Sequence, residues 1–128
     1  ARGAGTPSAA SVEAFEALLA RRLRHKPLAY ILGEVTAIRD AGPFREYLHE
    51  VPATLTAVGA RYLVQGGPVD HVEGPWQPRK VVLIEFPGWD VAAGWYRSDA
   101  YRPLAALRAG CSDTDLLLVE GATAPAPA

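Results

Sequence analysis

The chain has 128 residues, a formal net charge of −1 and 49% hydrophobic residues, which is the composition of one ordinary globular domain. These values exclude a disordered or strongly basic protein, and no apolar stretch approaches the roughly 20 residues that cross a bilayer. The single cysteine, Cys111, excludes an internal disulfide and suits a reducing compartment. We therefore expect a cytoplasmic protein that does not bind membranes.

An amphipathic helix is predicted over residues 11–26, because apolar residues recur every three or four positions, Ser11 is a suitable N-cap and Pro27 ends the pattern. The basic run at residues 21–26 falls at the C-terminal end of this helix, where cations stabilise the helix dipole. No aromatic platform accompanies it, so we do not expect nucleic-acid binding. Residues 1–27 are interpreted as a helical extension.

Six further regions follow this extension, and the fifth of them contains two short helices. Apolar and β-branched runs predict strands, and apolar residues at helical spacing predict helices. In order they are a strand at 28–36, a helix at 41–58, a strand at 61–65 resuming at 69–73 after a Gly-Gly-Pro bulge, a strand at 81–86, two short helices between 90 and 109, the second capped by Ser98, and a strand at 114–120. Pro52 should bend or divide the first of these helices. Residues 122–128, rich in Ala and Pro, are predicted to be a disordered tail.

The order strand, helix, strand, strand, helix, strand is that of the ferredoxin-like fold, an α+β fold with an antiparallel sheet and both helices on one face. Residues 81–86 are apolar at successive positions, so both faces of that strand need cover. Because the helices cover one face only, we expect two sheets to pack face to face in a homodimer, which would form a dimeric α+β barrel.

Several segments between residues 28 and 121 also match a known pattern. They are Ala29-Tyr30, Phe44 to Tyr47, Gly59 to Val64 with Gly66-Gly67, Glu73 to Pro78, Val82 to Phe86, Trp95 to Ser98 with Tyr101, and Asp113 to Gly121. Together they resemble a bacterial family of unknown function, number thirteen-thirty among such families. The resemblance implies a ferredoxin-like protomer in a dimeric α+β barrel. The wider group includes monooxygenases, haem-degrading enzymes, isomerases and cyclases, so it implies no single reaction.

Residues 15–33 carry a second resemblance, most clearly in Leu28 to Gly33. This segment is similar to the N-terminal helical region of release-factor glutamine methyltransferases. Such an enzyme needs a methyl-donor domain with an Asn-Pro-Pro-Tyr motif, and this sequence contains neither. We interpret the second similarity as coincidental.

Glu85 is the first candidate for chemistry. It lies in the strand at 81–86 on the face opposite Ile84 and Phe86, and therefore points into the dimer interior if those two side chains meet the helices. A carboxylate there either forms a structural ion pair with Arg61 or has a raised pKa that suits proton transfer. Both interpretations remain open at this point.

His71 is a second proton-transfer candidate, because the unperturbed pKa of histidine lies near 6.5, and an exposed strand histidine is the alternative. The three histidines lack metal-ligand spacing, and Gly66-Gly67-Pro68 does not lead into a helix as a phosphate loop would. We therefore expect no metal and no cofactor. Haem ligation would fit the wider fold group, but the sequence selects no histidine for it.

Aromatic residues are the candidate ligand-binding groups. Tyr30 in the first strand, with Trp95, Tyr96 and Tyr101 in the last helical region, would supply apolar walls and hydroxyl donors. Packing between helix and sheet is the alternative role of Trp95. Arg61 would hold a carboxylate or enolate oxygen of the ligand.

These features predict a small cofactor-independent enzyme of bacterial, possibly secondary, metabolism that isomerises or cyclises a small apolar or aromatic carbonyl compound. One alternative is a non-catalytic small-molecule-binding or accessory protein, and another is a cofactor-free monooxygenase. Glu85 paired with Arg61 among apolar walls would favour binding. A solvent-connected pocket that joins Glu85, His71 and a tyrosine would favour catalysis.

Overall fold

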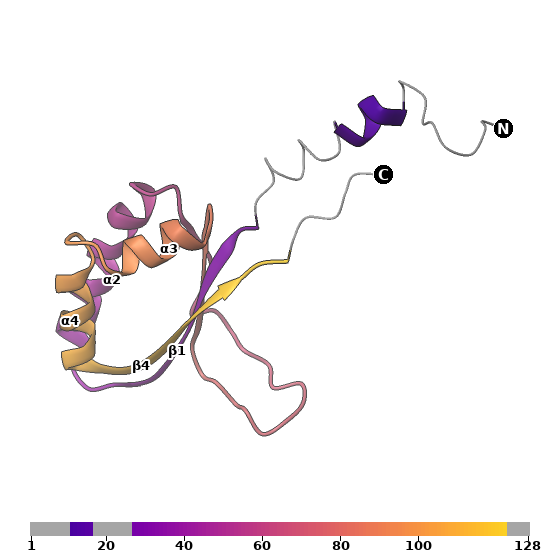
Figure 1. Cartoon of the computed structure of the whole chain (residues 1–128). Helices are drawn as coiled ribbons and strands as arrows, with labels where there is room; N and C mark the ends of the chain where they lie inside the picture. The colour runs from indigo at the N-terminus through magenta and orange to yellow at the C-terminus, as the bar shows by residue number, and fades with distance from the viewer. Residues whose placement is uncertain (1–10, 17–26, 123–128) are drawn as a thin grey trace.

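The computed structural model describes residues 11–16 and 27–122 (Figure 1). Residues 11–16 are helical, as expected for the start of the N-terminal helix. The rest of that predicted helix, at residues 17–26, lies outside the described residues, as do residues 1–10 and most of the predicted tail, at 123–128.

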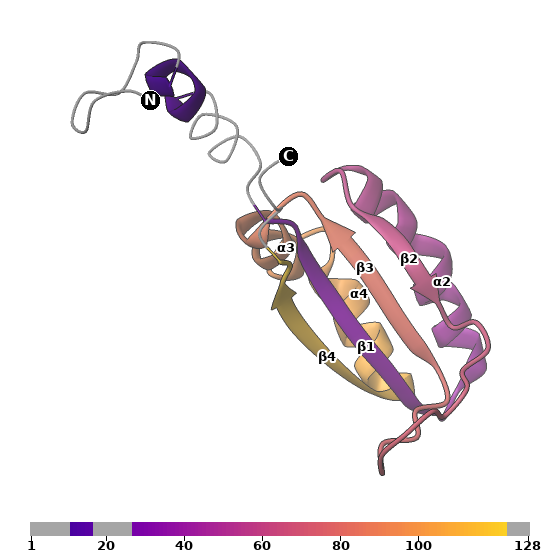
Figure 2. The ribbon, with the colours of Figure 1, turned by 90° about the vertical axis from the view of Figure 1, so that its right-hand side faces the viewer.

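Residues 27–122 form four strands and three helices. They are β1 (Ala29–Ile38), α2 (Ala41–Thr56), β2 (Arg61–Gln65), β3 (Val81–Phe86), α3 (Trp89–Tyr96), α4 (Arg102–Cys111) and β4 (Ser112–Glu120). The strands form one antiparallel sheet in the order β2-β3-β1-β4. All three helices lie on the same face of this sheet (Figures 1 and 2). The molecule therefore has the α+β ferredoxin-like fold expected from the sequence.

Local signals explain where α2 begins and ends. The Asp40 side chain accepts a hydrogen bond from the Gly42 amide at 3.2 Å and so caps the first turn. Gly59 follows the helix with φ of 75°, a backbone conformation that favours glycine. Of the two expected effects of Pro52, a division of the helix does not occur, because α2 is continuous through it. Val51 and Leu55, which are almost fully buried, hold the helix against the core on either side of the proline.

Two other sequence expectations were wrong. Residues 69–73 do not continue β2, because residues 66–80 form an exposed loop without strand pairing. Its three prolines lack the amide hydrogen that a ladder needs, and Gly66 and Gly74 turn the chain with positive φ. Ser98 does not cap α4 directly, because that helix begins at Arg102, although the Ser98 hydroxyl accepts a bond from the Tyr101 amide in the preceding turn.

The hydrophobic core lies between the sheet and the helices. Alternate residues of β1 are buried, beginning with Ala29 and Ile31, and Ile84 and Phe86 of β3 point the same way. Trp95 packs on this layer, with its ring centroid 5.3 Å from that of Phe86. The strand faces are thereby assigned as the sequence predicted, and Glu85 points away from the helices.

The sheet surface on the side without helices is called the open face here (Figure 2). Strand register places its side chains in three cross-strand rows, which are Arg61, Glu85, Tyr30 and Val119, then Val64, Leu83, Leu32 and Leu117, then Val81, Glu34 and Asp115. The middle row is entirely apolar, and Leu117 within it is 60% exposed. The described chain thus carries an uncovered apolar sheet surface.

Candidate functional site

Three of the predicted site residues lie together on the open face. Arg61 Nε donates to Glu85 Oε1 at 3.1 Å, and Tyr30 lies directly opposite Glu85 in the sheet. The Arg61 side chain is 71% exposed and that of Glu85 20%. Leu83 and Leu32 form the adjacent row. A carboxylate paired in this way beside apolar neighbours matches the arrangement that we associated with a structural or binding role.

His71 lies away from this group. It belongs to the exposed loop between β2 and β3 rather than to a strand, and its Nε2 is hydrogen-bonded to the Gly74 carbonyl oxygen. The loop enters β3 at Val81, whereas Glu85 lies near the other end of that strand. The structure therefore does not bring together the two predicted proton-transfer residues.

Trp95 and Tyr101 lie on the other side of the sheet, where the helices pack against it. Both are buried, and their rings stack with centroids 3.9 Å apart. Trp95 Nε1 donates to Thr54 Oγ1 at 2.9 Å, which ties α3 to α2. Trp95 thus has the packing role that was its alternative interpretation, while Tyr96 on the outer side of α3 is 43% exposed.

A buried polar cluster that the sequence did not reveal surrounds the Tyr101 hydroxyl. It consists of Tyr47, Tyr101 and Arg108 and is called the Tyr47–Tyr101–Arg108 cluster below. The two hydroxyl oxygens are 2.7 Å apart. Arg108 Nη1 donates to the Tyr101 hydroxyl at 2.5 Å and reaches that of Tyr47 at 3.5 Å. The helices α2 and α4, which pack together, bring these residues into contact.

The electrostatics of the cluster favour a charged arginine among neutral hydroxyls. Burial by itself lowers the pKa of Arg108, but the oxygens of Tyr101 and Tyr47 outweigh this effect and raise it overall. Burial, reinforced by Tyr47, raises the pKa of Tyr101 well above its usual value and that of Tyr62 to about 12. The Tyr101 and Tyr62 hydroxyls therefore stay protonated near neutral pH and serve as hydrogen-bond donors or acceptors.

This cluster borders a small hollow between the sheet and the helices α2 and α4, called the inner cavity. Its volume is about 40 Å³, enough for a few water molecules or one small polar group. Its polar lining residues are Tyr47, Tyr62, Gln65, Tyr101, Arg108 and Thr114, and the rest of the lining is mainly apolar. All three groups whose pKa is shifted among the described residues line this cavity.

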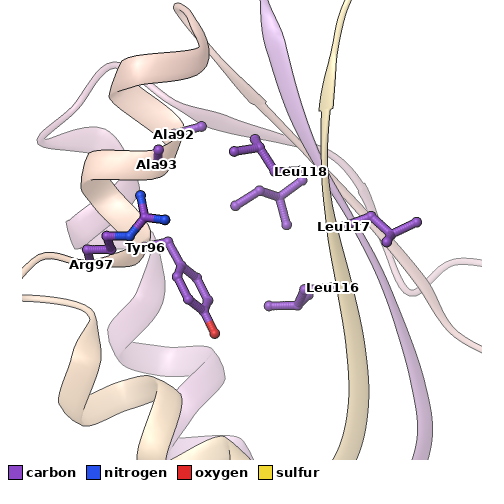
Figure 3. A pocket seen from close by; sticks show the side chains of 8 residues that line it. Ala92, Ala93, Tyr96, Arg97, Leu116, Leu117 and Leu118 are labelled. Carbon is purple, nitrogen blue, oxygen red and sulfur yellow. The ribbon is translucent and has the colours of Figure 1, made fainter.

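A larger hollow of about 270 Å³, called the outer pocket, lies between α3 and β4. Figure 3 shows the Tyr96 ring projecting from α3 toward Leu116. Its lining residues are Ile31, Ala92, Ala93, Tyr96, Arg97, Leu116, Leu117 and Leu118. Ile31 and Leu116 also line the inner cavity, so these two side chains separate the two hollows.

A glycine makes room for this partition. A Cβ atom at Gly33 would lie 2.7 Å from Leu116 Cδ2, closer than real contacts allow. Gly33 itself lines the inner cavity, and Leu116 is only half-buried. The absence of a side chain at position 33 therefore allows Leu116 to lie across β1 between the two hollows.

Known proteins share the sequence pattern and the fold of this chain. The family model described as Domain of unknown function (DUF1330) matches residues 28–122, about three quarters of the chain. The chain belongs to this family. A second model, described as PrmC N-terminal domain, matches residues 2–33, which contradicts the interpretation of the similarity to methyltransferases as coincidental. No curated protein matches the chain.

Two solved structures share the fold of this DUF1330 protein. One is the crystal structure of a protein of unknown function from Rhodopseudomonas palustris, determined as a structural genomics target, with 19% identity and a TM-score of 0.60 over 94% of this chain and 98% of that one. The other is a methylated form of that protein, with 17% identity and a TM-score of 0.62 over 91% and 93%. At these identities the similarity establishes the fold alone.

The described residues contain neither a metal-ligand cluster nor a membrane-spanning helix. Among residues 11–16 and 27–122, no three His, Cys, Asp or Glu side chains are grouped so as to share a metal ion. Within the same ranges, no helix has the length and hydropathy that spanning a membrane requires. Cys111 is free and buried at the end of α4.

Proposed function

We propose that this protein binds a small, largely apolar organic molecule between its sheet and its helices. The body of the ligand occupies the outer pocket and one polar group enters the inner cavity. The observation that carries the proposal is that two adjoining hollows share Ile31 and Leu116 as their common wall. Ligand pockets of roughly 300–1,000 Å³ are usually apolar with a few convergent polar groups, and the outer pocket lies just below that range.

The chemistry of the lining favours binding over acid–base catalysis. The described residues that line the two hollows include hydroxyls, Gln65 and two arginines, but no carboxylate and no histidine. Proton abstraction requires an acceptor within hydrogen-bond reach of the ligand. Glu85 lies on the open face, paired with Arg61, and His71 lies in the loop. The binding alternative is therefore better supported than the isomerase or cyclase that the sequence suggested.

Titration of the whole chain with benzamide, a small neutral aromatic probe, followed by ¹⁵N-edited NMR, would test the proposal. The expected shifts are confined to residues around the outer pocket, such as Ala92 and Leu118. Ala93→Leu, which fills the pocket from α3, should weaken binding at least tenfold. Ala106→Leu is the matched control, because Ala106 is exposed on α4 and lines neither hollow. Shifts centred on the open face, or unchanged affinity in Ala93→Leu, would contradict the proposal.

A second copy of this chain is the proposed cover of the open face. The apolar middle row offers the non-directional surface that homodimer interfaces use, and patches of this kind are rare on monomers. The Trp76 indole extends the surface at one edge, where Nε1 donates to Glu34 Oε1 at 3.0 Å, and the residue as a whole is 57% exposed. A homodimer in the bacterial cytoplasm is thus part of the proposal.

Sedimentation equilibrium tests the assembly. Wild type should sediment as a dimer and Leu117→Glu as a monomer, because the charge falls in the middle of the apolar row. Val72→Glu is the control, since Val72 is 88% exposed in the loop between β2 and β3. A monomeric wild type at micromolar concentration, or a dimer that tolerates Leu117→Glu, would refute this part of the proposal.

A further inference from the structure

Arg108 is a buried cation without an acidic partner. Arg108 is 8% exposed, and an arginine is rarely buried to this extent unless it is paired with an acidic group. The ion pairs among the described residues join Arg39 to Asp113 and Arg61 to Glu85, and neither involves Arg108. A positive charge is therefore held against the inner cavity and is balanced by neutral groups, namely the two tyrosine hydroxyls and the Tyr47 ring, whose centroid lies 5.6 Å from Arg108 Cζ.

The bonds that Arg108 makes leave one edge of its guanidinium unused. Nη1 donates to the Tyr101 hydroxyl at 2.5 Å and to the Tyr47 hydroxyl at 3.5 Å. Nε is buried and has no hydrogen-bond partner, and no bond joins Nη2 to the described residues. Nε and Nη2 form the fork that binds a carboxylate through two parallel hydrogen bonds. The unused edge is thus the one suited to a planar anion.

The tyrosines add a neutral donor on the Nη1 side of the same guanidinium. Tyr47 and Tyr101 each carry one hydroxyl hydrogen, and the contact between their oxygens uses only one of the two. Because both hydroxyls contact Arg108 Nη1, the second hydrogen is available beside the guanidinium. A hydroxyl donor next to a charged fork stabilises negative charge on a bound oxygen.

We propose that the ligand is a small organic carboxylate whose anionic head binds Arg108, with Tyr47 and Tyr101 beside it, while its apolar body occupies the outer pocket. This inference rests on the proposed function and specifies the class of ligand. The head fits the inner cavity of about 40 Å³ and the body the outer pocket of about 270 Å³. Rotation of the half-buried Leu116 side chain would join the two hollows.

The test compares benzoate with benzamide, which has a similar shape but no charge, by NMR titration of the whole chain at neutral pH. Benzoate affinity should fall at least tenfold in Arg108→Gln, while benzamide affinity stays within twofold of wild type. Arg45→Gln is the matched control, because it removes the same charge from an exposed site on α2 and should leave both ligands within twofold.

Each outcome separates this inference from the proposed function. Benzoate binding that is unchanged in Arg108→Gln, or equal losses for both probes, overturns the carboxylate site while shifts around Ala92 and Leu118 still support the pocket. Probes that bind elsewhere or not at all overturn both. Arg108→Met guards against misfolding, since an apolar side chain of similar length suits the buried position, and it should likewise lose benzoate but keep benzamide.

Discussion

Replacing Tyr101 by phenylalanine removes one hydroxyl from the Tyr47–Tyr101–Arg108 cluster and keeps the ring that stacks on Trp95 at 3.9 Å. The lost contacts are the 2.7 Å bond to Tyr47 and the 2.5 Å bond from Arg108. A neutral hydrogen bond contributes about 1 kcal/mol and one to a charged group about 1.5–3 kcal/mol. The free energy of unfolding should therefore fall by about 2–4 kcal/mol.

Urea unfolding followed by tryptophan fluorescence measures this loss. The control is Tyr96→Phe, whose exposed hydroxyl has no hydrogen-bond partner among the described residues, and which should change stability by less than about 0.5 kcal/mol. In an Arg108→Met background, Tyr101→Phe should cost only about 1 kcal/mol, because the charged partner is gone. If Tyr101→Phe costs less than about 0.5 kcal/mol in wild type, the cluster does not contribute as argued.

Three further perturbations test other parts of the account. Glu85→Gln should lower stability by less than about 1 kcal/mol in urea unfolding, because its partner Arg61 is largely exposed, and loss of folding would refute this. Gly121→Ala should cost about 1–3 kcal/mol by the same assay, since a Cβ there would lie 2.9 Å from the Leu28 carbonyl oxygen; wild-type stability would show that the end of β4 adjusts freely. Tyr62 has its pKa raised to about 12 from 10.0, so the unfolded chain loses this proton first and stability should fall as pH rises from 10 to 12. Thermal melts should show a shallower decline for Tyr62→Phe, and identical slopes would contradict the burial of this hydroxyl.

The fold was predictable because its signals are local. The alternation within β3 and the helical spacing in α2 depend only on residues close together in the sequence. From these two patterns the side of the sheet that faces the helices was predicted correctly. Pro52 does not divide α2, because core contacts of Val51 and Leu55 outweigh one missing hydrogen bond. No strand forms at residues 69–73, because the β-branched residues there have no neighbouring strand to pair with.

The candidate site was predictable only in part. The pairing of Glu85 with Arg61 was among the sequence interpretations, because both residues fall on strands with outward-facing positions. The Tyr47–Tyr101–Arg108 cluster depends on contacts across 54 and 61 positions of the chain, which no periodicity encodes. The one sequence signal was the position of Arg108 on the apolar stripe of α4, between Leu104 and Cys111.

The most direct test of the central claim is the crystal structure of the protein soaked with 4-bromobenzoate, located by the anomalous signal of bromine. The account predicts a bromine peak in the outer pocket between α3 and β4, with the carboxylate within about 3.2 Å of Arg108 Nε. A peak on the open face beside Glu85, or a carboxylate directed to solvent away from Arg108, would contradict it.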